Sequence, residues 1–282
     1  MKSRFKSRKI TENLTRIIGA TGECMYLAVG NERALLVDTG TGIGDLKGFV
    51  GTLTDKPLTV AMTHGHVDHV QGVSQFGEYY LNQKDLFLLD SNSDMQIRLN
   101  YARLMAVPAR NPNLAYIESD GFQPKVDPEK SRDIPDGTVF NLGGYTTEFH
   151  ALPGHTPGSM AVLFPEDRIL LTGDACCGTT LLYFEYCPSI EEYKEALTAL
   201  RAMLSGKFDR ILVSHGGHVF TEELLDSVLE CCDEIMAGTD EAFPMRGPDG
   251  TENPCAHSMD FIHGRLDGKP GNIVYSRNRI FR

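Results

Sequence analysis

The chain is organised around one stretch, Thr63-His64-Gly65-His66-Val67-Asp68-His69. It places three imidazoles and a carboxylate within six residues, directly after the apolar run 58–62. Imidazole and carboxylate are the usual protein ligands of zinc and related divalent cations. Crowding so many polar groups against a core strand would be costly if no cation bound them. The spacing therefore predicts a metal site in a strand-to-helix turn, with Asp68 where the helix begins.

Other polar residues occur in the same kind of context later and earlier in the chain. His155, Asp174 and His215 each lie at a predicted strand end, in a turn that contains glycine. Asp38 follows the apolar strand 34–37, where it is either an ordinary turn residue or a polar group delivered to a site. A lone histidine is more often structural than functional. Together with the first cluster, however, His155, Asp174 and His215 supply five histidines and two aspartates, a set suited to divalent metals.

In order and context, these residues resemble the signature of the metallo-β-lactamase superfamily. That signature is a His-x-His-x-Asp-His cluster, then a separate His, a bridging Asp and a final His. The resemblance covers residues 14–235 and rests also on Asp38-Thr39-Gly40, Gly154-His155-Thr156-Pro157-Gly158 and Thr172-Gly173-Asp174. It implies an α/β fold, an αββα sandwich with metals at the shared edge of two sheets.

The resemblance also implies a role for each residue around two divalent ions, zinc first, with iron or manganese as alternatives. A first metal would be held by His64, His66 and His155, a second by Asp68, His69 and His215, with Asp174 bridging and Asp38 steadying the cluster from behind. Asp68 and His218 are candidates for protonating the leaving group; the alternative for His218 is an exposed turn residue. Tyr183 and Tyr186 are candidate substrate contacts, although such aromatics are more often core.

These roles imply a dinuclear metal-dependent hydrolase. A metal-bridging hydroxide would cleave a small ester, lactone, thioester or amide. The nearest resemblance is to the lactonase and glyoxalase II-like dinuclear branch. There are departures: Cys177 stands where lactonases usually carry Tyr, and the basic glutathione-binding tail of glyoxalase II has no clear match. Alternatives are a phosphodiesterase of the same fold and an iron-dependent oxidoreductase of the persulfide dioxygenase type.

Composition limits the partners. The net charge is −11 over 282 residues, and the only basic run is in the first nine, which we expect to be a solvated arm. Nucleic acid is therefore disfavoured, and a small-molecule substrate is expected. There is no apolar run long enough to span a membrane. The seven cysteines are irregularly spaced, which favours a reduced, cytoplasmic protein. Homo-oligomerisation stays open.

The pattern predicts a single domain over residues 1–282. Residues 91–140 contain several prolines and are predicted to be an insert or lid over the site. Residues 237–282 are predicted to be a C-terminal extension with one strand, at 272–275. Apolar spacing predicts helices at 42–54, 95–105, 190–204 and 221–236.

Overall fold

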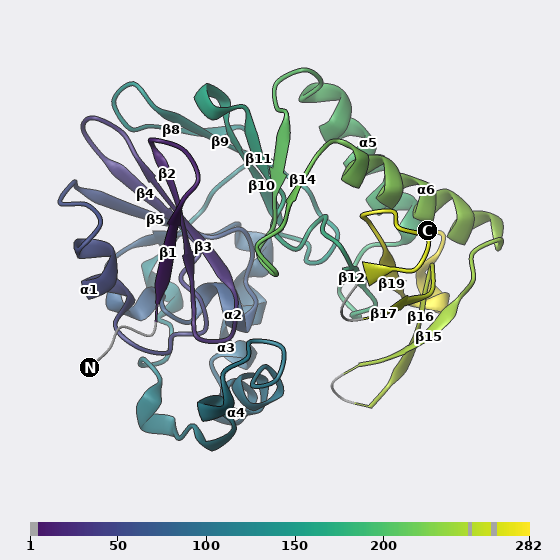
Figure 1. Ribbon diagram of the computed structural model, residues 1–282, viewed down its shortest axis with the longest axis horizontal. Coiled ribbons are helices and arrows are strands. Elements are labelled where there is room, and N and C mark those ends of the chain that lie inside the picture. The colour runs from purple at the N-terminus through teal and green to yellow at the C-terminus, as the bar shows by residue number, and fades with distance from the viewer. Residues whose placement is uncertain (1–4, 248–249, 261–263) are drawn as a thin grey trace. The chain divides into compact units, whose positions relative to one another are not determined.

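The computed structural model describes residues 5–247, 250–260 and 264–282. The chain forms two compact units (Figure 1). The first contains Met1–Phe149 and the short segment Ser214–Gly217. The second contains His150–Val213 and His218–Arg282. No helix in the described part of the chain combines the length and apolar character needed to cross a membrane.

The first unit is built on a mixed sheet. In spatial order its strands are β1 (Lys6–Lys9), β2 (Leu14–Ile18), β3 (Cys24–Val29), β4 (Ala34–Val37), β5 (Leu58–Ala61), β6 (Tyr79–Tyr80) and β7 (Ser131–Arg132). The strands from β1 to β4 are antiparallel, whereas β4 to β7 run parallel. The carboxyl ends of β4 and β5 therefore meet at one edge, which is where the metal motif begins.

Short helices connect these strands. They are α1 (Leu46–Gly51), α2 (Val67–Val70), α3 (Leu86–Asn92) and α4 (Met95–Leu104), with 3₁₀ turns at Val73–Gln75, Gln83–Asp85, Pro112–Tyr116, Ser119–Gly121 and Pro128–Lys130. β4 is buried along its whole length, as expected for a strand with an apolar run and neighbours on both edges. Buried residues from the sheet, α1 and α2 form one core, and this core supports the turn that contains the motif at residues 63–69.

The segment after α3 has its own small core. Ala102 and Ala106 pack with Ala20, Ile43, Leu114 and Ile117. Arg98 is almost fully buried, and its guanidinium donates to the carbonyl of Gln123 at 2.8 Å. It also lies over the Phe122 ring, 4.8 Å from the centroid, and burial lowers its pKa to about 10. The apolar contacts and the Arg98 bonds hold α4 firmly to the first unit.

The second unit contains a sheet and two long helices. In spatial order its strands are β14 (Val219–Phe220), β13 (Arg210–Leu212), β11 (Ile169–Leu171) and β10 (Met160–Phe164), followed by β9 (Thr146–Ala151), within which the boundary between the units falls. β8 (Thr138–Asn141), which pairs with β9, belongs to the first unit. α5 (Ile190–Met203) and α6 (Glu223–Ala237) pack side by side (Figure 1). Their apolar faces join the buried side of these strands in one core. A 3₁₀ turn at Pro165–Asp167 joins β10 to β11.

The C-terminal residues are more regular than the sequence predicted. They form β15 (Phe243–Arg246), β16 (Glu252–Cys255), β17 (Met259–Asp260), β18 (Gly264–Arg265), β19 (Ile273–Tyr275) and a 3₁₀ turn at Arg277–Arg279. β19 pairs with β12 (Thr180–Leu182) and β16, giving the order β12-β19-β16-β15. The prediction of a single strand was wrong because proline argues against a strand, yet Pro244 and Pro254 face one another across β15 and β16.

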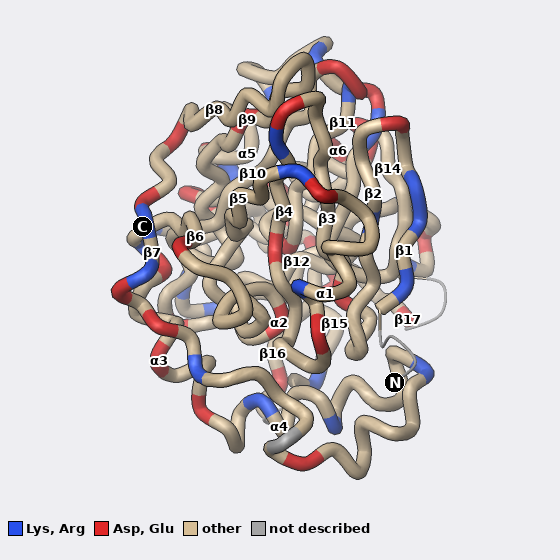
Figure 2. Tube along the Cα trace, turned by 90° about the vertical axis from the view of Figure 1, so that its left-hand side faces the viewer, with Lys and Arg blue, Asp and Glu red and all other residues tan. Residues whose placement is uncertain are grey.

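The N-terminal prediction also needs correction. Residues 6–9 are not a solvated arm but the edge strand β1, which pairs with β2 and carries Lys6, Arg8 and Lys9. These charges form the blue stretch beside the β1 label in Figure 2. Charged side chains on an exposed edge oppose pairing with another chain. The remainder of the predicted arm, residues 1–4, lies outside the described residues.

Candidate metal centre

Asp38 organises the motif turn in the first unit. Its Oδ1 accepts from the Thr63 backbone N–H at 2.7 Å, and its Oδ2 accepts from the Thr63 hydroxyl at 2.8 Å. Oδ2 also lies 2.9 Å from Nδ1 of His69. Asp38 has a φ of +64°, a strained conformation for a residue with a side chain. The strand end thus aims a buried carboxylate at the motif and fixes which nitrogen of His69 faces the cluster.

Gly65 packs tightly against the residues at the start of α3. A Cβ at this position would lie 3.0 Å from the Asp85 carbonyl and 3.2 Å from the Leu88 side chain. The backbone N–H of Gly65 donates to the buried carboxylate of Asp85 at 2.9 Å, and its carbonyl accepts from Asn92 at 2.9 Å. Both peptide groups between His64 and His66 are therefore held by the residues around α3, which orients the two rings.

His215 joins this cluster through a segment distant in sequence. The Cys24 N–H donates to the Ser214 carbonyl at 2.8 Å, and His215 forms an isolated antiparallel bridge with Glu23. Arg16 closes the segment by donating to the Gly217 carbonyl at 2.5 Å. Residues 214–217 therefore run beside the start of β3 as part of the first unit.

Glu23 supports the same region with its buried carboxylate. It accepts from the backbone and hydroxyl groups of Thr21 and Thr41, at distances of 2.6–3.1 Å. Burial raises the pKa of Glu23 above its ordinary value. A Cβ on Gly40 would lie 2.7 Å from the Glu23 carboxylate, so this glycine, with φ +70°, is required. Glu23 thus links the loop after Asp38 to the segment 214–217 that carries His215.

The donor atoms of the first unit are spaced as metal ligands are. Oδ2 of Asp68 lies 3.1 Å from Nε2 of His215 and 3.6 Å from Nε2 of His69. Two ligand atoms at about 2.1 Å from a tetrahedral zinc lie about 3.4 Å apart. The rings of His64 and His66 meet edge to face, with centroids 4.9 Å apart. The imidazoles of His69 and His215 and the carboxylate of Asp68 therefore have a spacing that fits a divalent cation. Asp38 supplies the outer hydrogen-bond partner that a metal-binding histidine needs.

The second unit brings His155 and Asp174 together. Nε2 of His155 lies 3.9 Å from Oδ2 of Asp174, while Nδ1 of His155 lies 2.9 Å from the Leu181 carbonyl. The carbonyl fixes the tautomer, so that Nε2 faces the carboxylate. This is the same arrangement that Asp38 imposes on His69.

Tyr193 on α5 supports the loop that contains His155 and the loop that contains Asp174. Its hydroxyl donates to the Ala175 carbonyl at 2.7 Å, directly after Asp174. Its ring packs under Gly154, where a Cβ would lie 2.4 Å from the ring. A side chain at position 154 would therefore displace either the ring or His155. Tyr193 is fully buried, and desolvation raises its pKa well above the ordinary value.

The remaining candidate residues, His218, Tyr183 and Tyr186, lie next to aromatic side chains. His218 is exposed, and its ring lies 5.9 Å from that of Phe220, so its role as a general acid stays a prediction. Tyr183 and Tyr186 both pack on Phe184, and the Phe184 ring meets His155 edge to face at 5.7 Å. The two tyrosines therefore contact Phe184, which in turn contacts the candidate ligand His155.

Several supporting residues had no signal in the sequence. Tyr101 on α4 donates to Oδ2 of Asp68 at 2.6 Å, across 33 positions. Asp85, Glu23 and Tyr193 likewise act over long separations and lie in no motif. Composition offers one hint. An acidic residue within an otherwise apolar stretch, if it is buried, needs hydrogen-bond donors close to it. Cysteines near the site are packing residues: burial raises the pKa of Cys176 well above the ordinary value for a thiol.

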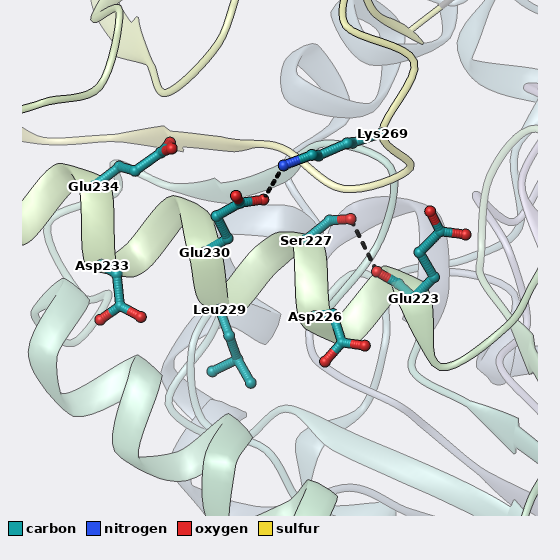
Figure 3. Close-up of a pocket in the computed structure, with 8 residues that line it drawn as sticks. All are labelled: Glu223, Asp226, Ser227, Leu229, Glu230, Asp233, Glu234 and Lys269. Carbon is teal, nitrogen blue, oxygen red and sulfur yellow. Dashed lines mark hydrogen bonds and ion pairs between the residues drawn. The ribbon is translucent and has the colours of Figure 1, made fainter.

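A groove along α6 is separate from these donors (Figure 3). Its lining is carboxylate-rich, and Lys269 pairs with Glu230 at 2.5 Å. The acidic side chains project from one exposed helix face, as on a solvated surface. The groove therefore suggests no second site.

The chain belongs to the metallo-beta-lactamase superfamily, whose family profile matches residues 21–215. Solved structures agree on the fold. A metallo-beta-lactamase from Pontibacter korlensis superimposes with a TM-score of 0.57 at 17% identity, over 80% of this chain and 97% of that one. The sec-alkyl sulfatase PisA1 superimposes with a TM-score of 0.59 at 14% identity, over 84% and 43% of the two chains. The predicted family and fold class are confirmed.

Some relatives carry names that describe an activity. The acyl-coenzyme A thioesterase MBLAC2 of Homo sapiens is 24% identical over 68% of this chain and 72% of its own. The hydroxyacylglutathione hydrolase GloC of Haemophilus influenzae is 23% identical over 70% of this chain and 86% of its own. Both names denote hydrolases, in agreement with the prediction that this chain is an enzyme of that class.

Proposed function

We propose that this protein is a dinuclear metal-dependent hydrolase of thioesters, with zinc as the expected metal. The observation that carries the proposal is the constellation in the first unit: Asp38 holds Nδ1 of His69, and Nε2 of His69 and of His215 both face Oδ2 of Asp68. Such an arrangement is costly as a structural feature alone, because it gathers polar groups in a buried place. It is ordinary around a cation.

The proposed ligand set follows the family pattern. His64 and His66, with His155 from the second unit, would hold one ion, and Asp68, His69 and His215 the other. Asp174 would bridge the two ions. When bound, two such cations lower the pKa of a shared water and polarise the attacked carbonyl, so no serine or cysteine nucleophile is needed. The chain's own contribution is to fix the donors: Asp38 and the Leu181 carbonyl orient two of the rings.

Thioesters are the proposed substrates because MBLAC2 is named an acyl-coenzyme A thioesterase and GloC is named a hydrolase of hydroxyacylglutathione, a molecule that joins an acyl group to a thiol compound. The departures noted in the sequence leave lactones and glutathione thioesters less favoured than other acyl thioesters. Residues 91–140 are proposed to shape access to the centre. We also propose a cytoplasmic location, since every cysteine is a free thiol and reducing compartments maintain that state.

Metal analysis and a hydrolysis screen test the proposal. Protein made without metal supplementation should contain about two equivalents of zinc. It should hydrolyse acyl-coenzyme A faster than lactones, β-lactams or bis-p-nitrophenyl phosphate, and lose this activity on chelation. Substantial iron with oxygen uptake would instead identify an oxidoreductase, and preferential cleavage of the phosphodiester would identify a phosphodiesterase.

Replacing Asp174 by asparagine should weaken binding of both ions. The amide is neutral and keeps only one oxygen, so a bridging role would be lost. We expect fewer than two metal equivalents after dialysis, measured by elemental analysis, and a parallel loss of kcat. Full retention of both ions by Asp174→Asn would exclude the bridging role. Glu166→Gln, in the turn between β10 and β11, is the matched control and should behave as the native protein.

A further inference from the structure

We propose that Tyr101 is a positioning residue of the metal centre, supplied by α4 to hold Asp68. This inference rests on the proposed function, because it assigns Asp68 to a metal. The Tyr101 hydroxyl donates to Oδ2 of Asp68 at 2.6 Å. The same oxygen faces Nε2 of His215 and of His69, so Tyr101 contacts the carboxylate at its ligating atom.

The contact is short and is made to a buried group. Asp68 is only 6% exposed, and the phenol is half-buried. Hydrogen bonds from a hydroxyl to a carboxylate are shorter and stronger than bonds between neutral groups. The bond limits rotation of the carboxylate, because it is made to the same oxygen that faces the two imidazoles. A carboxylate held in this way presents one oxygen to the cation in a fixed direction.

The rest of α4 is built to hold Tyr101 in place. Asp94 caps the helix, accepting from the N–H groups of Gln96 and Ile97 at 2.8 and 3.1 Å. One turn before Tyr101, Arg98 is buried and bonded to the Gln123 carbonyl. The next residue, Ala102, lies in the small core with Ile43 and Leu114. Tyr101 is thus carried by a helix anchored on both sides of it, not by a loose loop tip.

This gives the 91–140 segment a definite part in the chemistry. The ligand motif ends at His69, and the residue that steadies its aspartate comes from the segment predicted to be an insert or lid. A helix at this place can adjust the reaction centre through one hydroxyl. Neither the ligand motif nor any spacing in the sequence includes Tyr101.

The test is Tyr101→Phe in the full chain, which removes only the hydroxyl. We expect the ion at Asp68, His69 and His215 to bind about 10–100-fold more weakly, the usual effect of losing an outer partner of a metal ligand. The first ion should bind as before. Affinities for Zn²⁺ and Co²⁺ are measured by competition with a chromophoric chelator, and the Co²⁺ visible spectrum reports the geometry of each site. For the preferred thioester, kcat should fall with little change in KM.

Two further variants separate positioning from packing. Tyr101→Leu should lose no more ion affinity than Tyr101→Phe, because the hydroxyl is the active part. Tyr80→Phe is the matched control: this tyrosine is half-buried like Tyr101, lies in β6 outside the 91–140 segment and should leave affinity and kcat unchanged. Melting temperatures of all three variants report on folding.

The outcomes of the two proposals are distinguishable. If Tyr101→Phe binds both ions with native affinity, or if the native protein binds no ion through Asp68, the role of Tyr101 is disproved. If the native protein binds two ions but cleaves no thioester, the proposed substrate is wrong. The chelator competition still compares native protein with Tyr101→Phe in that case, and weaker binding of one ion supports the positioning role.

Discussion

Replacing His66 by alanine is expected to abolish measurable turnover. Metal ions contribute several kcal/mol to stabilising the charge that develops in such hydrolyses. Because each 1.4 kcal/mol or so corresponds to a factor of ten in rate, losing a ligand of the first ion should lower kcat by about 10³-fold or more. The measurement is kcat on the preferred thioester, with metal content determined on the same sample.

The backbone of His66 should tolerate this change. His66 is the N-cap of α2 in an extended conformation, and its carbonyl accepts from the N–H groups of His69 and Val70 at 3.0 and 3.2 Å. Alanine keeps that carbonyl, so the helix start and the position of His69 should survive. The melting temperature of chelated His66→Ala should therefore match that of the chelated native protein. Normal rates in His66→Ala with verified metal content would show that the ligand assignment is wrong.

Local patterns predicted the elements well where apolar spacing was regular. β4, β5, α4 and α5 lie where the sequence placed them, within a residue or two. The predicted helix at 42–54 is shorter: α1 spans only Leu46–Gly51. Asp45 caps it by accepting from the Gly48 N–H at 2.8 Å, and Gly48 weakens its interior. At this helix the Asp45 cap, and not the apolar spacing, decides where the helix begins.

Contacts between distant segments could not be predicted in the same way. The ligand types and their turns follow from local sequence. Among the partners that orient them, the family resemblance pointed to Asp38, and the others were not predicted. Asp38 meets His69 across 31 positions, and Arg16 meets Gly217 across 201. Such pairs depend on how the sheet brings strand ends together, which no single window of sequence records. Tyr101 is the extreme case, since a half-buried tyrosine in a helix is usually a packing residue.

Asp38 is the outer residue whose replacement should cost most. Asparagine fits the backbone, because it tolerates the left-handed conformation that Asp38 adopts at φ +64°. It cannot match the hydrogen bonds. Oδ1 accepts from the Thr63 N–H, and Oδ2 faces the Thr63 hydroxyl and Nδ1 of His69. Either orientation of the amide places its NH₂ group against one of these nitrogens.

The less costly orientation turns the NH₂ group towards His69. The ring then changes tautomer so that Nδ1 accepts, which puts the proton on Nε2, the atom that faces Asp68 at 3.6 Å. A protonated Nε2 cannot ligate a cation. We therefore expect Asp38→Asn to weaken the ion at Asp68, His69 and His215 by at least about 10–100-fold and to lower kcat in parallel.

Asp38→Ala should show a different balance between stability and metal binding. It leaves the buried Thr63 N–H without an acceptor, which costs about 1–3 kcal/mol. Its chelated form should therefore melt well below the chelated Asp38→Asn protein. In Asp38→Ala, however, His69 keeps the choice of either tautomer, so added Zn²⁺ should restore more of its ion binding than in Asp38→Asn. If Asp38→Asn instead binds both ions with native affinity, control of the His69 tautomer by Asp38 is disproved, and the carboxylate serves only to brace the turn.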